Sequence, residues 1–127
     1  MPYAIHWGGD PEDVLVVFMD EVPVEEALAA FDELRGSPEY HGSLRIIQDW
    51  RAIEWSRVTG EELRRRAEAV VANTAPDERH QVAVVVDRQL AFGLTRMHGA
   101  YIDGRITTTD QVFYDFASAR AWLGRET

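Results

Sequence analysis

The run of apolar residues at positions 82–86, VAVVV, limits the fold of this chain more than any other stretch. Four of its five residues are β-branched, and the run is too short to cross a membrane, so it predicts a strand buried on both faces. Asp87 follows in the position of a helix N-cap, ahead of a helical pattern that continues to Gly104. A doubly covered strand that leads directly into a helix is half of a parallel βαβ crossover, which predicts an α/β fold.

The segments on either side continue the alternation of strands and helices. Residues 3–7 alternate large apolar with small or polar residues, and the turn-rich segment 8–13 separates them from an apolar strand at 14–19. This pattern predicts an antiparallel hairpin whose first strand lies at the sheet edge. Further strands are predicted at 44–50 and 107–114, and helices at about 23–35, 60–72 and after the cap Asp115. The predicted architecture is a mixed α/β sheet in which parallel strands with crossover helices follow the hairpin.

The length and composition narrow the function classes. The 127 residues form one domain, 1–127, with 22 acidic against 13 basic residues and a net charge of −9. Such a surface repels phosphate backbones, so we expect no nucleic-acid binding. No apolar run reaches membrane length and no leader pattern opens the sequence, so we expect no membrane insertion and a cytoplasmic location.

Catalytic signals are weak throughout the sequence. The chain has neither cysteine nor lysine, which excludes disulfides, cysteine nucleophiles and lysine Schiff bases. The four histidines lack a metal-binding spacing such as His-x-x-x-His, and no serine stands in a Gly-x-Ser-x-Gly context. We therefore expect a protein without enzymatic activity, metal or cofactor.

Two stretches in the second half resemble a known family: the helix DRQLAFGLTRMHGAY at 87–101 and the closing segment QVFYDFASARAWLG at 111–124. Together with the element order, they resemble the STAS family, the domain of anti-sigma-factor antagonists (SpoIIAA-like), and in particular small bacterial STAS-like proteins of unassigned function. The resemblance implies a STAS-like (SpoIIAA-like) mixed sheet. It also implies a non-enzymatic regulatory or protein-interaction module that binds a protein partner.

The resemblance further implies a regulatory turn. In the anti-sigma antagonists, a partner kinase phosphorylates a serine in an Asp-Ser-Ser-Gly-like turn after the third strand, at the start of a helix. The corresponding turn here holds Ser56, Arg57, Thr59 and Gly60, with Arg57 in place of the usual aspartate. Thr59 also has a structural interpretation, because Thr59 and Glu62 form a capping box for the helix that begins at Gly60.

An alternative function is the binding or transport of a small apolar ligand or lipid in a pocket between the helices and the sheet. Two tryptophans flank a predicted loop, and two aspartates end consecutive parallel strands at the edge where open α/β sheets place their ligands. The predicted pocket rim is therefore Asp49, Trp50, Trp55 and Asp87. The competing interpretation is that the tryptophans pack in the core and the aspartates are turn or cap residues.

The helix after Asp87 is predicted to have a second working face. At about 100° per residue, four large residues fall in one stripe that should face the sheet: Leu90, Leu94, Met97 and Tyr101. The opposite face suits an interface and consists of Phe92, Thr95, Arg96 and Gly99. Its simplest partner is a second copy of the chain in a homodimer. Alternatively, Phe92 packs under a neighbouring helix of its own chain.

Overall fold

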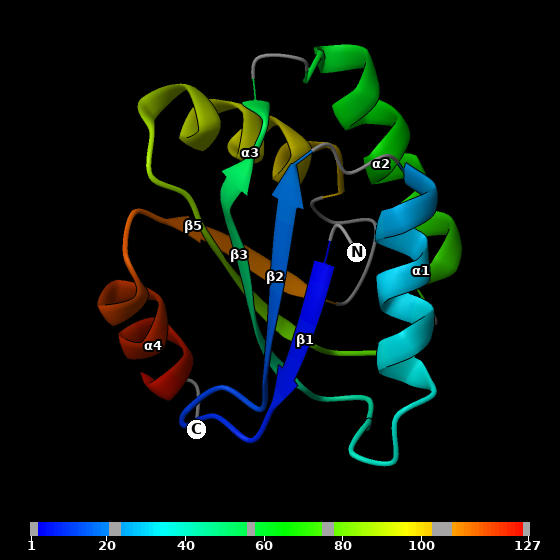
Figure 1. Ribbon diagram of the computed structural model, residues 1–127, viewed down its shortest axis with the longest axis vertical. Helices are drawn as coiled ribbons and strands as arrows, with labels where there is room; N and C mark the ends of the chain where they lie inside the picture. The colour runs from blue at the N-terminus through cyan, green and yellow to red at the C-terminus, as the bar shows by residue number, and fades with distance from the viewer. Residues whose placement is uncertain (1–2, 21–23, 56–57, 75–77, 103–107, 126–127) are drawn as a thin grey trace.

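The computed structural model describes residues 3–20, 24–55, 58–74, 78–102 and 108–125, except for the side chains at positions 24, 90, 92, 97, 101, 102 and 125. Five strands of this part form one sheet in the order β1-β2-β3-β4-β5 (Figure 1). They are β1 (Tyr3–Trp7), β2 (Val14–Asp20), β3 (Arg45–Ile53), β4 (Gln81–Val85) and β5 (Thr109–Phe113). β1 pairs antiparallel with β2, and every later pair is parallel, which confirms the predicted mixed sheet with its N-terminal hairpin.

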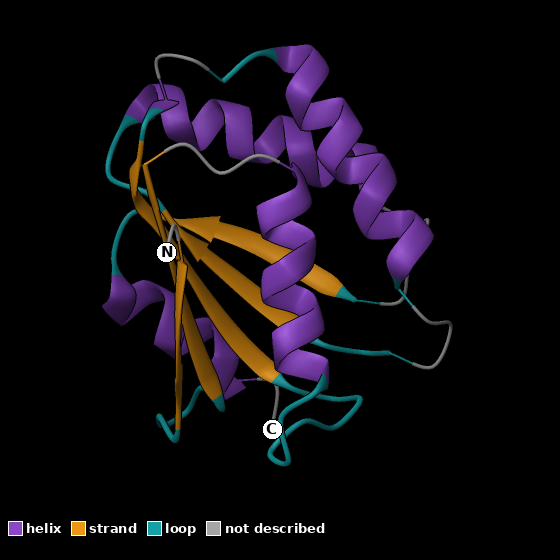
Figure 2. Cartoon of the chain, turned by 45° about the vertical axis from the view of Figure 1, so that its right-hand side comes forward, coloured by secondary structure: helices purple, strands orange, loops and turns teal. Residues whose placement is uncertain are grey.

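The helices cover both faces of the sheet unequally (Figure 2). α1 (Val24–Arg35), α2 (Gly60–Asn73) and α3 (Gln89–Ile102) lie on one face, and α4 (Phe116–Arg125) packs on the other. Each parallel pair of strands is joined through one of the first three helices, as a parallel connection requires. The observed order, β-β-α-β-α-β-α-β-α, is the predicted one.

The sheet separates two apolar cores, and β4 contributes to both. The larger core, on the side of α1, includes Phe18, Ile46, Trp50 and Val84. The smaller core, on the side of α4, consists of Ile47, Ala83, Val85, Ala119 and Leu123. Residues 83–86 are all buried, so the apolar run is covered on both faces as predicted.

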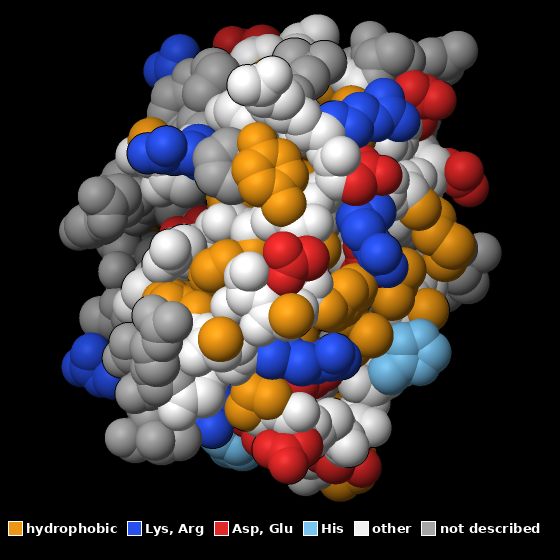
Figure 3. Space-filling view, turned by 90° about the vertical axis from the view of Figure 1, so that its left-hand side faces the viewer, with side chains coloured by type: hydrophobic (Ala, Val, Ile, Leu, Met, Phe, Trp, Pro, Cys, Tyr) orange, Lys and Arg blue, Asp and Glu red, His pale blue; other side chains and the backbone are white. Residues whose placement is uncertain are grey.

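The loop between β1 and β2 is held against α4 by an ion pair between residues far apart in the sequence. Glu12 is buried, and its carboxylate accepts hydrogen bonds from Arg120 Nε at 3.1 Å and Nη2 at 3.0 Å. Burial raises the pKa of Glu12, but the hydrogen bonds from Arg120 and the backbone outweigh it, so the pKa is lowered. Seen from the side of α4 and β5, basic, acidic and apolar side chains are interspersed over the surface (Figure 3).

Differences from the predicted boundaries of β3 and α3 move candidate site residues. β3 continues to Ile53 because Ala52 and Ile53 pair with the end of β2, so Trp50 lies inside a strand and not beside a loop. α3 begins at Gln89, so Asp87 is not its N-cap. The Val86 N–H donates to the Phe113 carbonyl at 2.9 Å. This bond extends the pairing between the two strands past Val85, so the helix begins later in the sequence.

The inward stripe predicted for α3 is described at Leu94 alone, because the side chains at positions 90, 97 and 101 lie outside the described part. Leu94 is half-buried and packs against the larger core, and the buried side chains among the described ones are Ala91, Thr95 and His98. The helix packs against α2 and against β5 of the sheet, and small side chains permit that close approach. Thr95 can be buried at low cost because its hydroxyl donates to the Ala91 carbonyl at 2.7 Å within the same helix.

Candidate ligand pocket between the helices and the sheet

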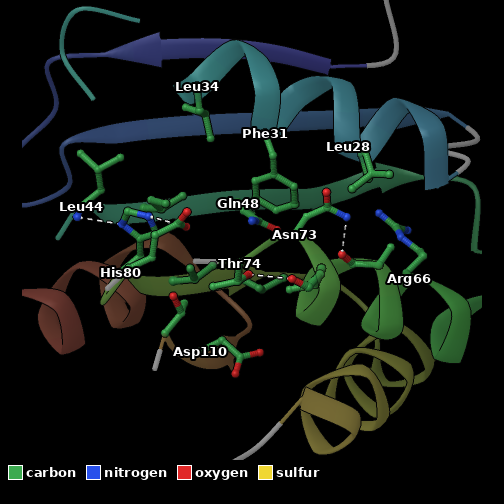
Figure 4. Close-up of a pocket in the computed structure, with 18 of the residues that line it drawn as sticks. Leu28, Phe31, Leu34, Leu44, Gln48, Arg66, Asn73, Thr74, His80 and Asp110 are labelled. Atoms are coloured by element: carbon green, nitrogen blue, oxygen red, sulfur yellow. Dashed lines mark hydrogen bonds and ion pairs between the residues drawn. The ribbon is translucent and has the colours of Figure 1, made fainter. Parts of the chain in front are cut away.

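A cavity of about 100 Å³ lies on the side of the larger core, between the sheet and the helices α1, α2 and α3 (Figure 4). Most of its wall is apolar. α1 contributes Leu28, Phe31 and Leu34, whose side chains point into the space from one side (Figure 4). The opposite wall, from the sheet, includes Ile46, Val82 and Val84. Protein interiors contain few voids larger than a water molecule, so a space of this size is a notable feature of a small domain.

One end of the cavity holds Arg66 of α2 (Figure 4). Leu63 and Ala67 on the same helix are fully buried, so the neighbouring Arg66 is carried inward and is only 8% exposed. Its guanidinium carbon lies 5.3 Å from the centroid of the Trp50 ring, a cation–π contact. Within the described residues, no carboxylate forms an ion pair with Arg66.

Among the described side chains that line this end, Arg66 carries the charge. Burial lowers the pKa of Arg66, and the Glu62 carboxylate opposes that effect, yet a guanidinium stays protonated in proteins. His98, at 9% exposed, packs edge-on against Trp50 with ring centroids 5.9 Å apart. Burial, and then the charge of Arg66, lower the pKa of His98 to about 4. His98 is therefore neutral at pH 7, and this end carries a single positive charge.

The other end of the cavity is closed by a satisfied polar cluster around His80 (Figure 4). His80 Nδ1 accepts from the Leu44 N–H at 3.0 Å, and Nε2 lies 3.3 Å from Glu78 Oε2. Glu78 Oε1 is also 3.2 Å from Arg35 Nη2. Burial lowers the pKa of His80 despite the opposing effect of Glu78. Because Nδ1 accepts from the Leu44 N–H, the neutral ring carries its proton on Nε2. This cluster ties the start of β3 to the segment before β4.

Other polar groups in the wall interact mainly with their own helices. Asn73 Nδ2 donates to the Ala69 carbonyl at 2.8 Å, and Thr74 Oγ1 donates to the Val70 carbonyl at 2.7 Å. Thr108 Oγ1 is buried and has no hydrogen-bond partner in the part of the chain that the structure describes. The described residues contain no cluster of three or more acidic or histidine side chains that could hold a metal ion. Nor do they include a helix long and apolar enough to cross a membrane.

Of the four residues predicted for a pocket rim, one lines the cavity, namely Trp50. Trp55 is buried in the core beside it, where its Nε1 donates to the Trp50 carbonyl at 3.2 Å. Asp49 is one residue from Trp50 on a strand, so it faces the opposite side of the sheet, where it pairs with Arg51 at 2.9 Å. Asp87 is exposed and lies outside the pocket wall.

The predicted regulatory turn is described only in part. Thr59 is exposed and caps α2, because its Oγ1 accepts from the Glu62 N–H at 3.1 Å and the helix begins at Gly60. The prediction of a structural cap is therefore confirmed. Ser56 and Arg57 lie outside the described residues.

The predicted interface on α3 is wrong at two of its four positions. Thr95 is 2% exposed and faces the interior. Gly99 approaches its own chain, since a Cβ added there would lie 3.2 Å from Asp110 Oδ2 on β5. Arg96 is exposed, and the side chain of Phe92 lies outside the described part. A homodimer stays a prediction.

Sequence reasoning missed Arg66, His80 and His98 as residues of the pocket. A signal for Arg66 was present: it lies three residues after Leu63 and four before Val70, on the apolar stripe of α2. The two histidines gave no signal of their own, because their burial depends on contacts between distant segments.

Comparisons with known proteins identify the fold. The sequence matches no protein-family profile and no curated protein. Among solved structures it is similar to an uncharacterized protein from the DUF3478 family with a SpoIIAA-like fold, from Shewanella loihica PV-4. The two share 14% sequence identity with a TM-score of 0.60, over 95% of this chain and 91% of the other. The chain thus has a SpoIIAA-like fold, as the sequence resemblance predicts.

Proposed function

We propose that this protein is a non-enzymatic binding module whose pocket takes a compact apolar ligand. The observation that carries the proposal is the cavity of about 100 Å³, walled by apolar side chains from α1, α2 and the sheet. An empty apolar cavity destabilises a protein, because the groups that line it lose packing contacts. A ligand would restore those contacts, which supports binding as the purpose of the space.

The size of the cavity selects the ligand class. An engineered apolar cavity of roughly 150 Å³ holds benzene, so about 100 Å³ suits one ring or a short branched chain. A diacyl lipid would need a far larger space. Neither buried histidine of the pocket suits general base catalysis: burial lowers the pKa of His98 to about 4, and His80 is held by two neighbouring segments.

The proposal is tested by NMR titration of the ¹⁵N-labelled protein with toluene, a neutral apolar probe. In the wild type, we expect saturable shifts of the amides of Val70, Val82 and Val84, which line the cavity. Ala69→Phe should abolish them, because Ala69 lines the cavity and a phenyl ring there fills it. Ala72→Phe is the matched control, since Ala72 is exposed on the same helix.

Two outcomes would contradict the proposal. One is the absence of saturable shifts at the solubility limit of toluene. The other is equal binding to wild type and to a folded Ala69→Phe protein, which would place the ligand outside the cavity. A dispersed spectrum of each variant establishes that it is folded.

A second candidate function is a phosphorylation-regulated protein-interaction module resembling the anti-sigma-factor antagonists. The observation that favours it is the exposed hydroxyl of Thr59 at the N-terminus of α2. A phosphate at this position would meet free N–H groups and the positive end of the helix dipole. Mass spectrometry of the protein isolated from its own cells should then detect phosphate on Thr59. If the peptide is fully covered and unmodified under growth and starvation conditions, this second candidate fails.

A further inference from the structure

We propose that the ligand of the pocket is a monocarboxylate, with its apolar body in the cavity and its carboxylate paired with Arg66. This inference rests on the function proposed above and specifies the ligand's chemistry. It follows from one feature of the pocket, a buried cation that forms no ion pair with a carboxylate in the described part of the chain.

Arg66 is the feature that an entirely apolar ligand leaves unexplained. Arg66 is 8% exposed as a whole residue, so it has lost most of its contact with solvent. Buried charges are ordinarily paired, and within the described residues Arg66 has a cation–π contact with Trp50 but no carboxylate partner. A carboxylate from the ligand would supply the missing anion, and the planar guanidinium can bind it through two parallel hydrogen bonds.

The surroundings of Arg66 favour a ligand with one negative charge. His98 beside it is neutral, so the site offers one positive charge for one carboxylate. The two carboxylates that line the cavity, Glu78 and Asp110, lie away from Arg66: Glu78 contacts His80 at the opposite end, and Asp110 projects from β5 (Figure 4). A second negative charge on the ligand would approach these carboxylates. The pocket therefore selects monoanions over dianions.

The apolar wall accounts for the rest of the ligand. Phe31 and Leu28 project from α1 toward the same space as Arg66 (Figure 4), and Val84 lies in the facing wall. A single ring or short alkyl chain attached to the carboxylate would contact these side chains while the charged group reaches Arg66. The net charge of −9 opposes the approach of anions, so the selectivity comes from this local site and not from long-range attraction.

The test compares benzoate with benzamide, which has nearly the same shape but no charge, by the NMR titration used for toluene. Wild type should bind benzoate roughly 10- to 100-fold more tightly than benzamide, the value of a hydrogen-bonded charge. Arg66→Met should bring benzoate to the affinity of benzamide while toluene binding is kept. Arg64→Met, an exposed arginine on the same helix, should leave all three affinities unchanged.

The outcomes separate this inference from the function on which it rests. Toluene binding together with equal affinities for benzoate and benzamide overturns the carboxylate inference and leaves the apolar pocket standing. A preference for benzoate that survives in Arg66→Met also overturns it. Failure of all three probes refutes both proposals. Arg66→Lys keeps the charge and should retain part of the benzoate preference. It therefore tests the role of the charge even if the methionine variant fails to fold. Phthalate, a dianion, should bind more weakly than benzoate.

Discussion

Replacing Arg66 by methionine should make the protein without its ligand more stable. Arg66 is 8% exposed as a whole residue, and removing such an ion from water costs several kcal/mol. The cation–π contact with Trp50 offsets at most about 2 kcal/mol of this desolvation cost. Methionine is unbranched, as the arginine stem is, so it keeps the packing without leaving a charge buried. The difference gives an expected gain of about 1–3 kcal/mol in the free energy of unfolding.

Urea unfolding followed by circular dichroism measures this gain, with thermal unfolding as a second readout. For a domain of this length, the gain corresponds to a rise in Tm of roughly 3–10 °C. Arg64→Met serves as the control and should change the stability by less than about 0.5 kcal/mol, because Arg64 is exposed. A loss of 1 kcal/mol or more in Arg66→Met would refute the reasoning, since it would show that Arg66 stabilises the fold itself. A stabilised variant that no longer binds carboxylates is the pattern of a residue kept for function.

Three further predictions concern charges and caps. Glu12→Gln should lower the free energy of unfolding by about 1–2 kcal/mol at pH 7. The reason is that a neutral amide replaces the buried carboxylate that pairs with the half-exposed Arg120. Since the folded pKa of Glu12 is lowered, the difference between wild type and variant should disappear as the pH falls below about 4 in urea titrations. His98 has a folded pKa of about 4 against its ordinary 6.5, so the unfolded chain binds more protons between these values. Stability should therefore fall by about 2–4 kcal/mol as the pH drops from 6.5 to 4, and His98→Phe should remove most of that slope. Thr59→Ala should cost about 1 kcal/mol by loss of the N-cap, and Thr59→Ser should cost far less; equal losses would contradict the capping role.

Most of the fold was predictable because it depends on local patterns. The apolar run at 82–86, the hairpin at the N-terminus and the Thr59 cap each contain enough information in a few residues to define an element. Their order then implied a mixed sheet, and the solved structure with a SpoIIAA-like fold agrees. The errors arose where contacts between distant segments set the boundaries of an element. β3 is longer than predicted because it pairs with the end of β2, and α3 begins later than predicted because the Val86 N–H bonds to the Phe113 carbonyl.

The pocket was predictable in kind but not in its residues. A space between helices and sheet follows from the architecture, whereas its wall depends on side-chain alternation and on helix orientation. Asp49 was misplaced by one position on a strand, which moved it to the other face of the sheet. On α3, Thr95 was assigned to the outward face, yet the helix buries it beside Ala91 where it meets its neighbours.

A crystal structure of the protein soaked with 4-bromobenzoate tests the central claim most directly, because anomalous scattering locates the bromine without reference to the rest of the ligand. The account predicts a bromine peak in the apolar part of the cavity, near Phe31 and Val84, with the carboxylate within hydrogen-bond distance of the Arg66 guanidinium. An occupied site elsewhere on the surface, or a ligand in the cavity with its carboxylate turned away from Arg66, would contradict it.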